Sequence, residues 1–284
     1  MALKSWQVIG SVVLITSITV LMQISSETWI TSATVSLIMG ASALACMASS
    51  CILASRWHGI ERLFGGLDRV YEAHKWIAIW ALIFAVYHFV FKAKLDAWDL
   101  APILELSKYW TRLMRQLSLV ALGLIILLAL NRKIPYGNWR WLHKFSGPLF
   151  LIVILHWLSF ESPITLTSPA GIWLALLCSV GVIAALYKMI LYPFIAKAGE
   201  YKLVAISQGK AAVHLEFEPV RKGFQFKAGQ FSFISLKEGE FPSYFTVKQA
   251  LAIKPFGNFG TYTQEGLPTF NKVPRADVLD ELGD

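Results

Sequence analysis

Six apolar segments, each close to the length that crosses a lipid bilayer, constrain this chain more than any other feature of its sequence. They lie near residues 6–23, 33–55, 74–92, 113–131, 141–160 and 171–193. A helix needs about 20 mainly apolar residues to span the hydrocarbon layer. The chain of 284 residues is 56% hydrophobic and only 15% charged, which is unlike a soluble domain. The sequence therefore predicts an all-α, six-helix transmembrane bundle over residues 1–195.

The distribution of lysine and arginine among the loops predicts how the bundle is oriented. Both the link between the second and third segments and the link between the fourth and fifth are rich in these residues, whereas the links after the first and fifth contain none. Cytoplasmic loops carry such an excess. The loop from Lys92 to Arg115 disagrees, but the other four loops outweigh it. We expect a multi-pass protein of the inner or plasma membrane with both termini in the cytoplasm.

The net charge of +8 is explained by a membrane surface, and we expect no nucleic acid as a partner, because no basic run is interleaved with aromatic residues. Beyond about Gly199 the pattern changes to short alternating segments, "YKLVAIS", "AAVHLEFEPV" and "QFSFISL". Alternation of this kind is typical of β-strands. Residues 199–284 are therefore predicted to form a cytoplasmic β domain, either a small barrel or half of a larger one.

Two of the apolar segments carry a pair of histidines. His74 and His88 are 14 residues apart, and His143 and His156 are 13 apart. At 1.5 Å per residue, the members of each pair lie about 20 Å apart along a helix. Because the two segments cross in the same direction, His74 and His143 share one depth, and His88 and His156 share another.

Ionisable groups inside a membrane are costly and usually functional. Two neutral imidazoles facing each other at one depth are the ligand set of bis-histidine haem, so the pattern predicts an inner haem on His74 and His143 and an outer haem on His88 and His156. A single membrane histidine is more often a hydrogen-bonding partner for another helix. A zinc or di-metal site fits poorly, because the spans offer no nearby carboxylates or thiolates.

The second pair raises a geometric difficulty. At 100° per residue a separation of 13 leaves His143 and His156 about 140° apart around a straight helix. We therefore expect a bend between them, for which Gly147 and Pro148 are suited.

The segments that carry the histidines resemble a known family. "RLFGGLDRVYEAHKW" followed by "YHF", together with "WRWLHKFSG" and a later histidine, is similar to the ferric reductase-like transmembrane domain of ferric reductases and NADPH oxidases. The resemblance covers about residues 30–195. It implies two haem b groups that carry electrons from a cytoplasmic flavin to an acceptor on the far side, either a ferric chelate or oxygen.

The C-terminal part resembles the start of the flavin-binding barrel of the same family. "FKAGQFSFISL" supplies Gly229 and Gln230, and "SYFTV" retains Phe245 and Thr246, with Ser243 and Tyr244 at the family's His and Pro positions. The resemblance implies that Gly229, Gln230, Phe245 and Thr246 contact FAD. Taken alone, "FKAGQFSF" is equally a strand entered through a glycine turn.

No glycine-rich nicotinamide-binding turn follows in this sequence. We therefore expect either a separate NAD(P)H-dependent reductase as donor or a truncated product that passes few electrons.

Cationic residues at the predicted cytoplasmic end are candidates to pair with the inner haem propionates. They are Arg56, Arg62, Arg69, Arg140 and Lys144. The positive-inside bias explains the same residues without any ligand.

The sequence assigns no catalytic side chain, because the redox chemistry would belong to the haem. It predicts an oxidoreductase that needs a partner or a further domain to oxidise NAD(P)H. Two alternatives stay open. One is a haem membrane subunit of a periplasmic reductase system, and the other is a non-catalytic subunit that binds a complete homologue.

Overall fold

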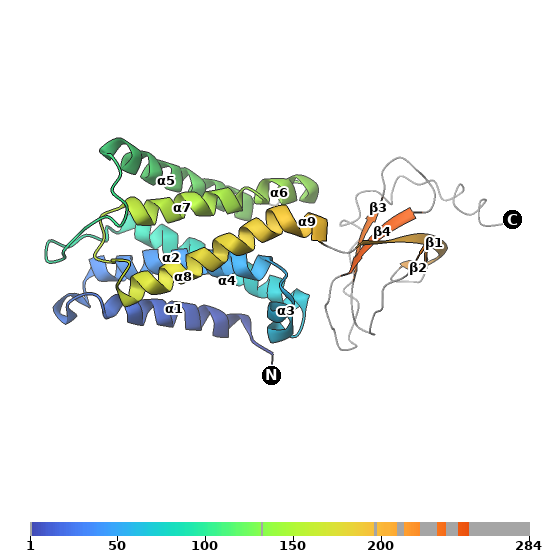
Figure 1. Ribbon diagram of the computed structural model, residues 1–284, viewed down its shortest axis with the longest axis horizontal. Helices are drawn as coiled ribbons and strands as arrows, with labels where there is room; N and C mark the ends of the chain where they lie inside the picture. The colour runs from blue at the N-terminus through green and yellow to red at the C-terminus, as the bar shows by residue number, and fades with distance from the viewer. Residues whose placement is uncertain are drawn as a thin grey trace. The chain divides into compact units, whose positions relative to one another are not determined.

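The fold was analysed in a computed structural model, which describes residues 2–131, 133–195, 198–208, 213–221, 232–236 and 244–249. The chain divides into two compact units, one built from helices and one from strands. Figure 1 shows the long helices lying side by side along a common direction.

A helix begins and ends near each of the six predicted segments. These six are α1 (Ser5–Leu21), α2 (Ser32–Ala54), α4 (Leu67–Val90), α5 (Lys108–Leu130), α7 (Ser146–Ser159) and α8 (Pro169–Leu186). Shorter elements connect or extend them, namely η1 (Ser26–Thr28), α3 (His58–Phe64), α6 (Tyr136–His143), the π-helix η2 (Tyr187–Leu191) and α9 (Tyr192–Ile195).

Four helical stretches within the described residues are long and apolar enough to cross a membrane. They are Ser32–Ala54, Leu67–Val90, Trp141–Ser159 and Pro169–Leu191. Helix α1 is apolar as well, but it has 17 residues. The chain is thus mostly helical with four candidate spans, and crossing by all six predicted segments stays a prediction.

Helix α2 forms the centre of the helical unit and packs against α1, α4 and α8. Small residues allow this close approach: Ala45, Cys46 and Ala48 are fully buried. A Cβ added to Gly181 of α8 would lie 3.1 Å from the Cα of Ala48. Small residues at such crossings are typical of helices that pack in membranes.

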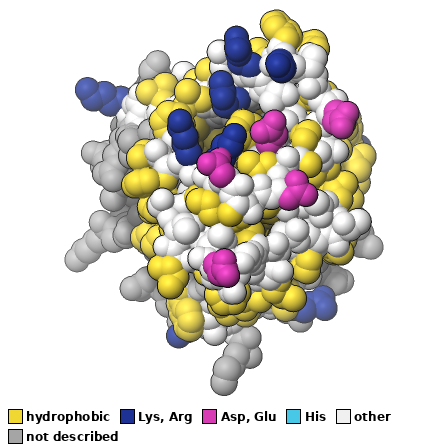
Figure 2. Space-filling model, turned by 90° about the vertical axis from the view of Figure 1, so that its left-hand side faces the viewer, with side chains coloured by type: hydrophobic (Ala, Val, Ile, Leu, Met, Phe, Trp, Pro, Cys, Tyr) yellow, Lys and Arg dark blue, Asp and Glu magenta, His cyan; other side chains and the backbone are white. Residues whose placement is uncertain are grey.

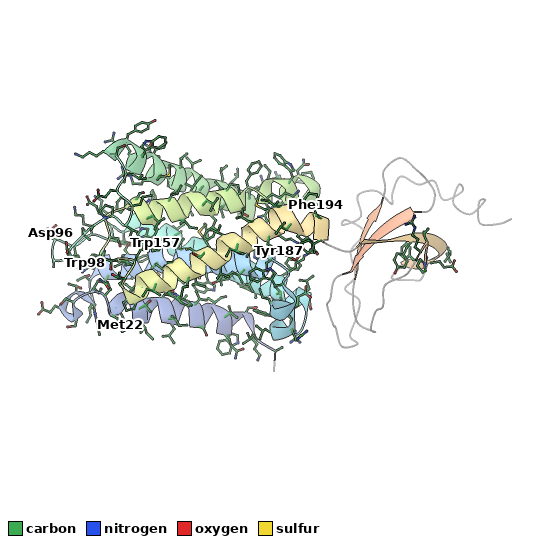
Figure 3. All side chains as sticks on the ribbon, viewed as in Figure 1. Met22, Asp96, Trp98, Trp157, Tyr187 and Phe194 are labelled. Carbon is green, nitrogen blue, oxygen red and sulfur yellow. The ribbon has the colours of Figure 1, made fainter. Side chains whose placement is uncertain are left out.

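Two ends of the helical unit can be recognised in Figure 3. Met22, Asp96 and Trp98 lie at one end, here called the Trp98 end, and Tyr187 and Phe194 lie at the other, the Phe194 end. The loop at the Trp98 end is fixed to its neighbours, since the Trp98 indole donates to the Thr28 hydroxyl at 3.2 Å.

The α-helix is interrupted between His143 and His156, in the region where a bend was expected. Helix α6 ends at His143, and α7 begins at Ser146 after a turn at Lys144 and Phe145. Pro148 is the third residue of α7, where its missing N–H costs no helical hydrogen bond. The two histidines therefore lie on two short helices and need not share the azimuth of one straight helix.

The strand unit contains the three predicted strand segments and one further strand. The strands are β1 (Ala198–Gln208), β2 (Val213–Pro219), β3 (Ser232–Leu236) and β4 (Tyr244–Gln249). They form one antiparallel sheet in the order β2-β1-β4-β3. The described strands make this open sheet, and a closed flavin-type barrel stays a prediction.

Candidate functional site

Each histidine of α4 is hydrogen-bonded to a serine of α2. The Nδ1 atom of His74 lies 3.0 Å from the carbonyl oxygen of Ser50, and the Nδ1 atom of His88 lies 3.0 Å from that of Ser36. The hydroxyl oxygens of the same serines are 3.0 Å and 3.2 Å from the two rings. The two serines are 14 residues apart, like the two histidines. Because the later serine pairs with the earlier histidine, α2 and α4 run antiparallel.

The contacts with the serine carbonyls favour one tautomer of both rings. A carbonyl oxygen can only accept a hydrogen bond, so Nδ1 must carry the proton in each case. The lone pair then lies on Nε2, which is the atom free to bind a metal. Neutral imidazoles with a hydrogen-bonded Nδ1–H are the usual form of metal-binding histidine.

Gly40 of α2 lies against the ring of His88. A Cβ at this position would be 2.7 Å from Nδ1, closer than any side chain fits. In addition, the Ser36 hydroxyl donates to the carbonyl of Phe91 at 2.6 Å, at the residue that caps α4. Ser36 and Gly40 of α2 thus both restrict the position of the His88 ring.

The structure brings His74 and His143 together, as the sequence predicted from their shared depth. Their ring centroids are 6.1 Å apart and their planes are nearly perpendicular, at 89°. His143 also stacks on Trp139, with centroids 4.7 Å apart and an angle of 10°. The Trp139 indole donates to the carbonyl of Leu128 in α5 at 3.3 Å.

His156 lies in the last turn of α7, near His88 and Arg115 of α5. Its ring is tilted against Phe160, with centroids 5.4 Å apart. Its Nδ1 atom is buried and has no hydrogen-bond partner within the described residues.

We tested whether these residues fit the haem implied by the sequence. The rings of His74 and His143 are in contact, His74 and His88 present Nε2 as the free nitrogen, and the buried Nδ1 of His156 has no partner in the described residues. Groups of three or more His, Cys, Asp or Glu that would hold a bare metal ion are absent from the described residues. The donor set fits an apolar macrocycle with two axial imidazoles per iron.

The propionate candidates have different surroundings, and their predicted role stays untested. Arg56 donates to the hydroxyls of Tyr71 and Tyr192 at 2.6 Å and 3.1 Å. Arg62, Arg69 and Lys144 have exposed side chains. Arg140 lies in α6, and its side chain is outside the described part of the structure.

The predicted flavin contacts are also untested. Phe245 and Thr246 lie in β4, a central strand, where they pair with Leu236 and Ser235 of β3. Gly229, Gln230 and Ser243 lie outside the described residues.

A buried acid near the Phe194 end was not anticipated from the sequence. Glu61 of α3 is 7% exposed, and its Oε2 atom has no partner among the described groups. Burial raises the pKa of Glu61 to about 7, although the nearby Arg56 and Lys188 act to lower it. Arg56 has a φ of 61°, an uncommon conformation for a residue other than glycine.

The face at the Trp98 end carries basic side chains close to acidic ones, mainly in its upper part (Figure 2). The residues of the predicted basic loop are exposed: Lys92, Lys94, Lys108, Arg112 and Arg115. Lys108, Arg112 and Arg115 follow each other at intervals of four and three along α5, so they share one side of that helix.

Comparison with known proteins gives one family. No curated protein matches the chain. Residues 39–154, which include three of the four histidines, match the model of the family described as "Ferric reductase like transmembrane component". Together with the apolar helices, this match makes the chain a multi-pass membrane protein. Residues 39–154 therefore correspond to the ferric reductase-like transmembrane component family.

Proposed function

We propose that this protein is a membrane haem b protein that carries electrons across the bilayer from a cytoplasmic flavin or NAD(P)H donor to an external acceptor. The observation that carries the proposal is the repeated hydrogen bond from α4 to α2, which presents the Nε2 atoms of His74 and His88 at two levels. The family implies transmembrane electron transfer and an oxidoreductase role, and its members typically bind haem.

In this proposal His74 and His143 hold the inner haem, and His88 and His156 hold the outer one. Bound haem would supply a reversible one-electron iron centre. The protein's residues bind and orient: the Ser50 and Ser36 carbonyls hold the Nδ1 protons, and Trp139 fixes the plane of His143. Phe150 and Ile77, both almost fully buried, contribute to the dry interior that such centres need.

The proposed orientation puts the Phe194 end in the cytoplasm. Support comes from the start of α1 and the end of α9, which lie at the same end of the helical unit in Figure 1, as an even number of crossings requires. The positive-inside bias of the loops gives the direction. The Trp98 end then faces outward.

We propose an anionic ferric chelate or oxygen as the acceptor. The exposed basic side of α5 favours an anion by simple electrostatics. For the donor side, a separate NAD(P)H-dependent reductase would deliver electrons, with FAD on the strand unit near Gly229, Gln230, Phe245 and Thr246. Flavin fluorescence of the purified protein, with and without added FAD, tests whether the strand unit binds FAD.

The first test of the proposed function is a haem count on detergent-purified protein by the pyridine haemochrome assay. We expect close to two haem b per chain with low-spin spectra. His74→Ala and His88→Ala should each remove about one haem, and His214→Ala, in the strand unit, should remove none. Protein that lacks haem after haem-replete expression would contradict the proposal and would favour the non-catalytic subunit.

A further inference from the structure

Helix α5 carries a row of cations along one exposed side. Lys108, Arg112 and Arg115, here called the α5 basic row, all have exposed side chains, and the helix contains no Asp or Glu. Neither a hydrogen bond nor an ion pair joins these three side chains to any described residue. Arg56, at the Phe194 end, instead donates to two tyrosine hydroxyls. Within the described chain, the α5 basic row therefore has no counter-ion.

The length of α5 brings the last cation of the row to the edge of the hydrocarbon layer. The helix ends at Leu130, so only residues 116–130 lie beyond Arg115. They make about 22 Å of helix, whereas the hydrocarbon layer is about 30 Å thick. In the predicted crossing of α5, the Arg115 side chain therefore starts at or inside this layer and extends back toward the headgroups. The anions nearest to a cation at that depth are lipid phosphates.

Two exposed aromatic side chains lie beside the first cation of the row. Tyr109 is 69% exposed and Trp110 is 51% exposed, and their rings meet edge to face with centroids 5.5 Å apart. Tyrosine and tryptophan are enriched at the level of the lipid headgroups. Because both follow Lys108 directly, they support placing the start of α5 at that level.

An apolar strip continues from the α5 basic row along the helix. Leu119, Gly123 and Leu127 follow Arg115 at intervals of four residues, so they form one ridge. Leu119 is 46% exposed and Leu127 is 57% exposed, and a Cβ at Gly123 would meet no atom within 4 Å. Helix α5 packs mainly on α7 and lies at the edge of the helical unit in Figure 1. The ridge is therefore open to an acyl chain.

We propose that the α5 basic row binds the headgroup phosphate of an anionic phospholipid, with an acyl chain lying along the ridge from Leu119 to Leu127. Charge complementarity selects the ligand, because a row of cations without an acid favours a lipid of net negative charge over a zwitterionic one. Arginine can hold a phosphate through two parallel hydrogen bonds. The exposed Lys92 and Lys94, in the loop before α5, attract a soluble anion to the same end. This lipid site does not depend on haem.

The test counts the lipids retained by the full chain. Protein in detergent is mixed with equal amounts of phosphatidylglycerol and phosphatidylcholine that carry the same acyl chains, and bound lipid is measured by native mass spectrometry. We expect the wild-type protein to retain one phosphatidylglycerol at concentrations at which phosphatidylcholine dissociates. The double substitution Arg112→Gln and Arg115→Gln should weaken this binding at least about tenfold.

Two matched variants separate the row from the overall charge. The double substitution Lys92→Gln and Lys94→Gln removes the same charge at the same end and should leave the retained phosphatidylglycerol unchanged. Arg112→Lys with Arg115→Lys keeps the charge and should retain most of the preference for phosphatidylglycerol.

Equal retention of the two lipids by the wild-type protein would overturn the proposal, and this measurement needs no variant. An equal loss in the Lys92 and Lys94 variant would also overturn it, because overall charge would then decide. Displacement of phosphatidylglycerol by citrate at constant ionic strength would assign the row to a soluble anion instead. A haem count on the same samples is independent, so protein without haem that still prefers phosphatidylglycerol would contradict only the proposed function.

Discussion

The indole of Trp139 lies face to face with the imidazole of His143, with the ring centroids 4.7 Å apart and the planes within 10° of parallel. This contact fixes the azimuth of a histidine at the end of a short helix, where backbone restraint is weak. Stacked aromatic pairs contribute roughly 0.5–1.5 kcal/mol beyond their buried area.

Replacing Trp139 by alanine should therefore loosen the inner site. We expect Trp139→Ala to lose up to one haem per chain, or to convert the inner haem partly to a high-spin form, as measured by haemochrome and electron paramagnetic resonance. Trp141→Ala is the matched control, because Trp141 lies on the same helix and is 58% exposed. Equal losses of haem in both variants would show that haem binding depends on the stability of α6 and not on the stacking of Trp139.

Gly40→Ala should disturb the outer site. The added methyl group would lie 2.7 Å from Nδ1 of His88, so the ring must leave the Ser36 carbonyl. Overpacking of this kind costs about 1–3 kcal/mol. We expect a lower thermal midpoint and a shifted outer-haem signal. Gly123→Ala in α5 meets no atom within 4 Å and should change neither.

Thr16→Val should weaken the packing of α1 on α8. The Thr16 side chain is fully buried, and its hydroxyl accepts a hydrogen bond from the Trp173 indole at 3.0 Å. Valine keeps the shape but leaves that N–H unpaired, at a cost of about 1 kcal/mol in a membrane protein. The thermal midpoint in detergent is the readout. Thr19→Val, which removes a hydroxyl bonded only within α1, is the control and should have a smaller effect.

Glu61 predicts a pH dependence of stability. Its pKa in the folded protein is about 7 because of burial, whereas an unfolded glutamate has a pKa of about 4.3. Since the folded pKa is the higher one, the stabilising contribution is complete below about pH 4 and is lost as the pH rises through about 7. Glu61→Gln should leave the thermal midpoint at pH 5 nearly unchanged.

At pH 8.5 the same substitution should raise stability, by on the order of 1 kcal/mol, because the neutral amide avoids the burial of a charge. Asp96→Asn is a control with an exposed carboxylate at the opposite end. A Glu61→Gln midpoint that falls at pH 8.5 would mean that ionised Glu61 pairs with Arg56 or Lys188 and stabilises the fold.

Much of the helical unit could be predicted, because apolar length is a direct signal of a membrane helix. The segments at 33–55 and 171–193 begin within two residues of α2 and α8. The third began seven residues early in the structure, at Leu67, because Asp68, Arg69 and Glu72 in the first turns of α4 conceal a helix that starts outside the apolar run. The need for a bend before His156 followed from helical geometry alone, and the break lies two residues before Gly147.

The hydrogen-bond partners of the histidines were harder to predict from the sequence. Serine inside a membrane helix is common, and the interaction that matters here uses the backbone carbonyl, which every residue has. The one available signal was the equal spacing of 14 residues in Ser36–Ser50 and His74–His88, which has meaning only once the two helices are known to be antiparallel neighbours. Glu61 gave no signal either, because its burial depends on how α3 folds back.

Helix α2 contributes none of the four histidines, yet it determines where two of them lie. The carbonyls of Ser36 and Ser50 are 14 residues apart, which corresponds to about 21 Å along a helix. An insertion of one residue between them would rotate one carbonyl by 100° and detach its histidine. In the proposed function, the distance between the two redox centres on α4 therefore depends on the spacing of Ser36 and Ser50 in a neighbouring helix. That distance could be changed by redesigning α2 and α4 together without altering any ligand.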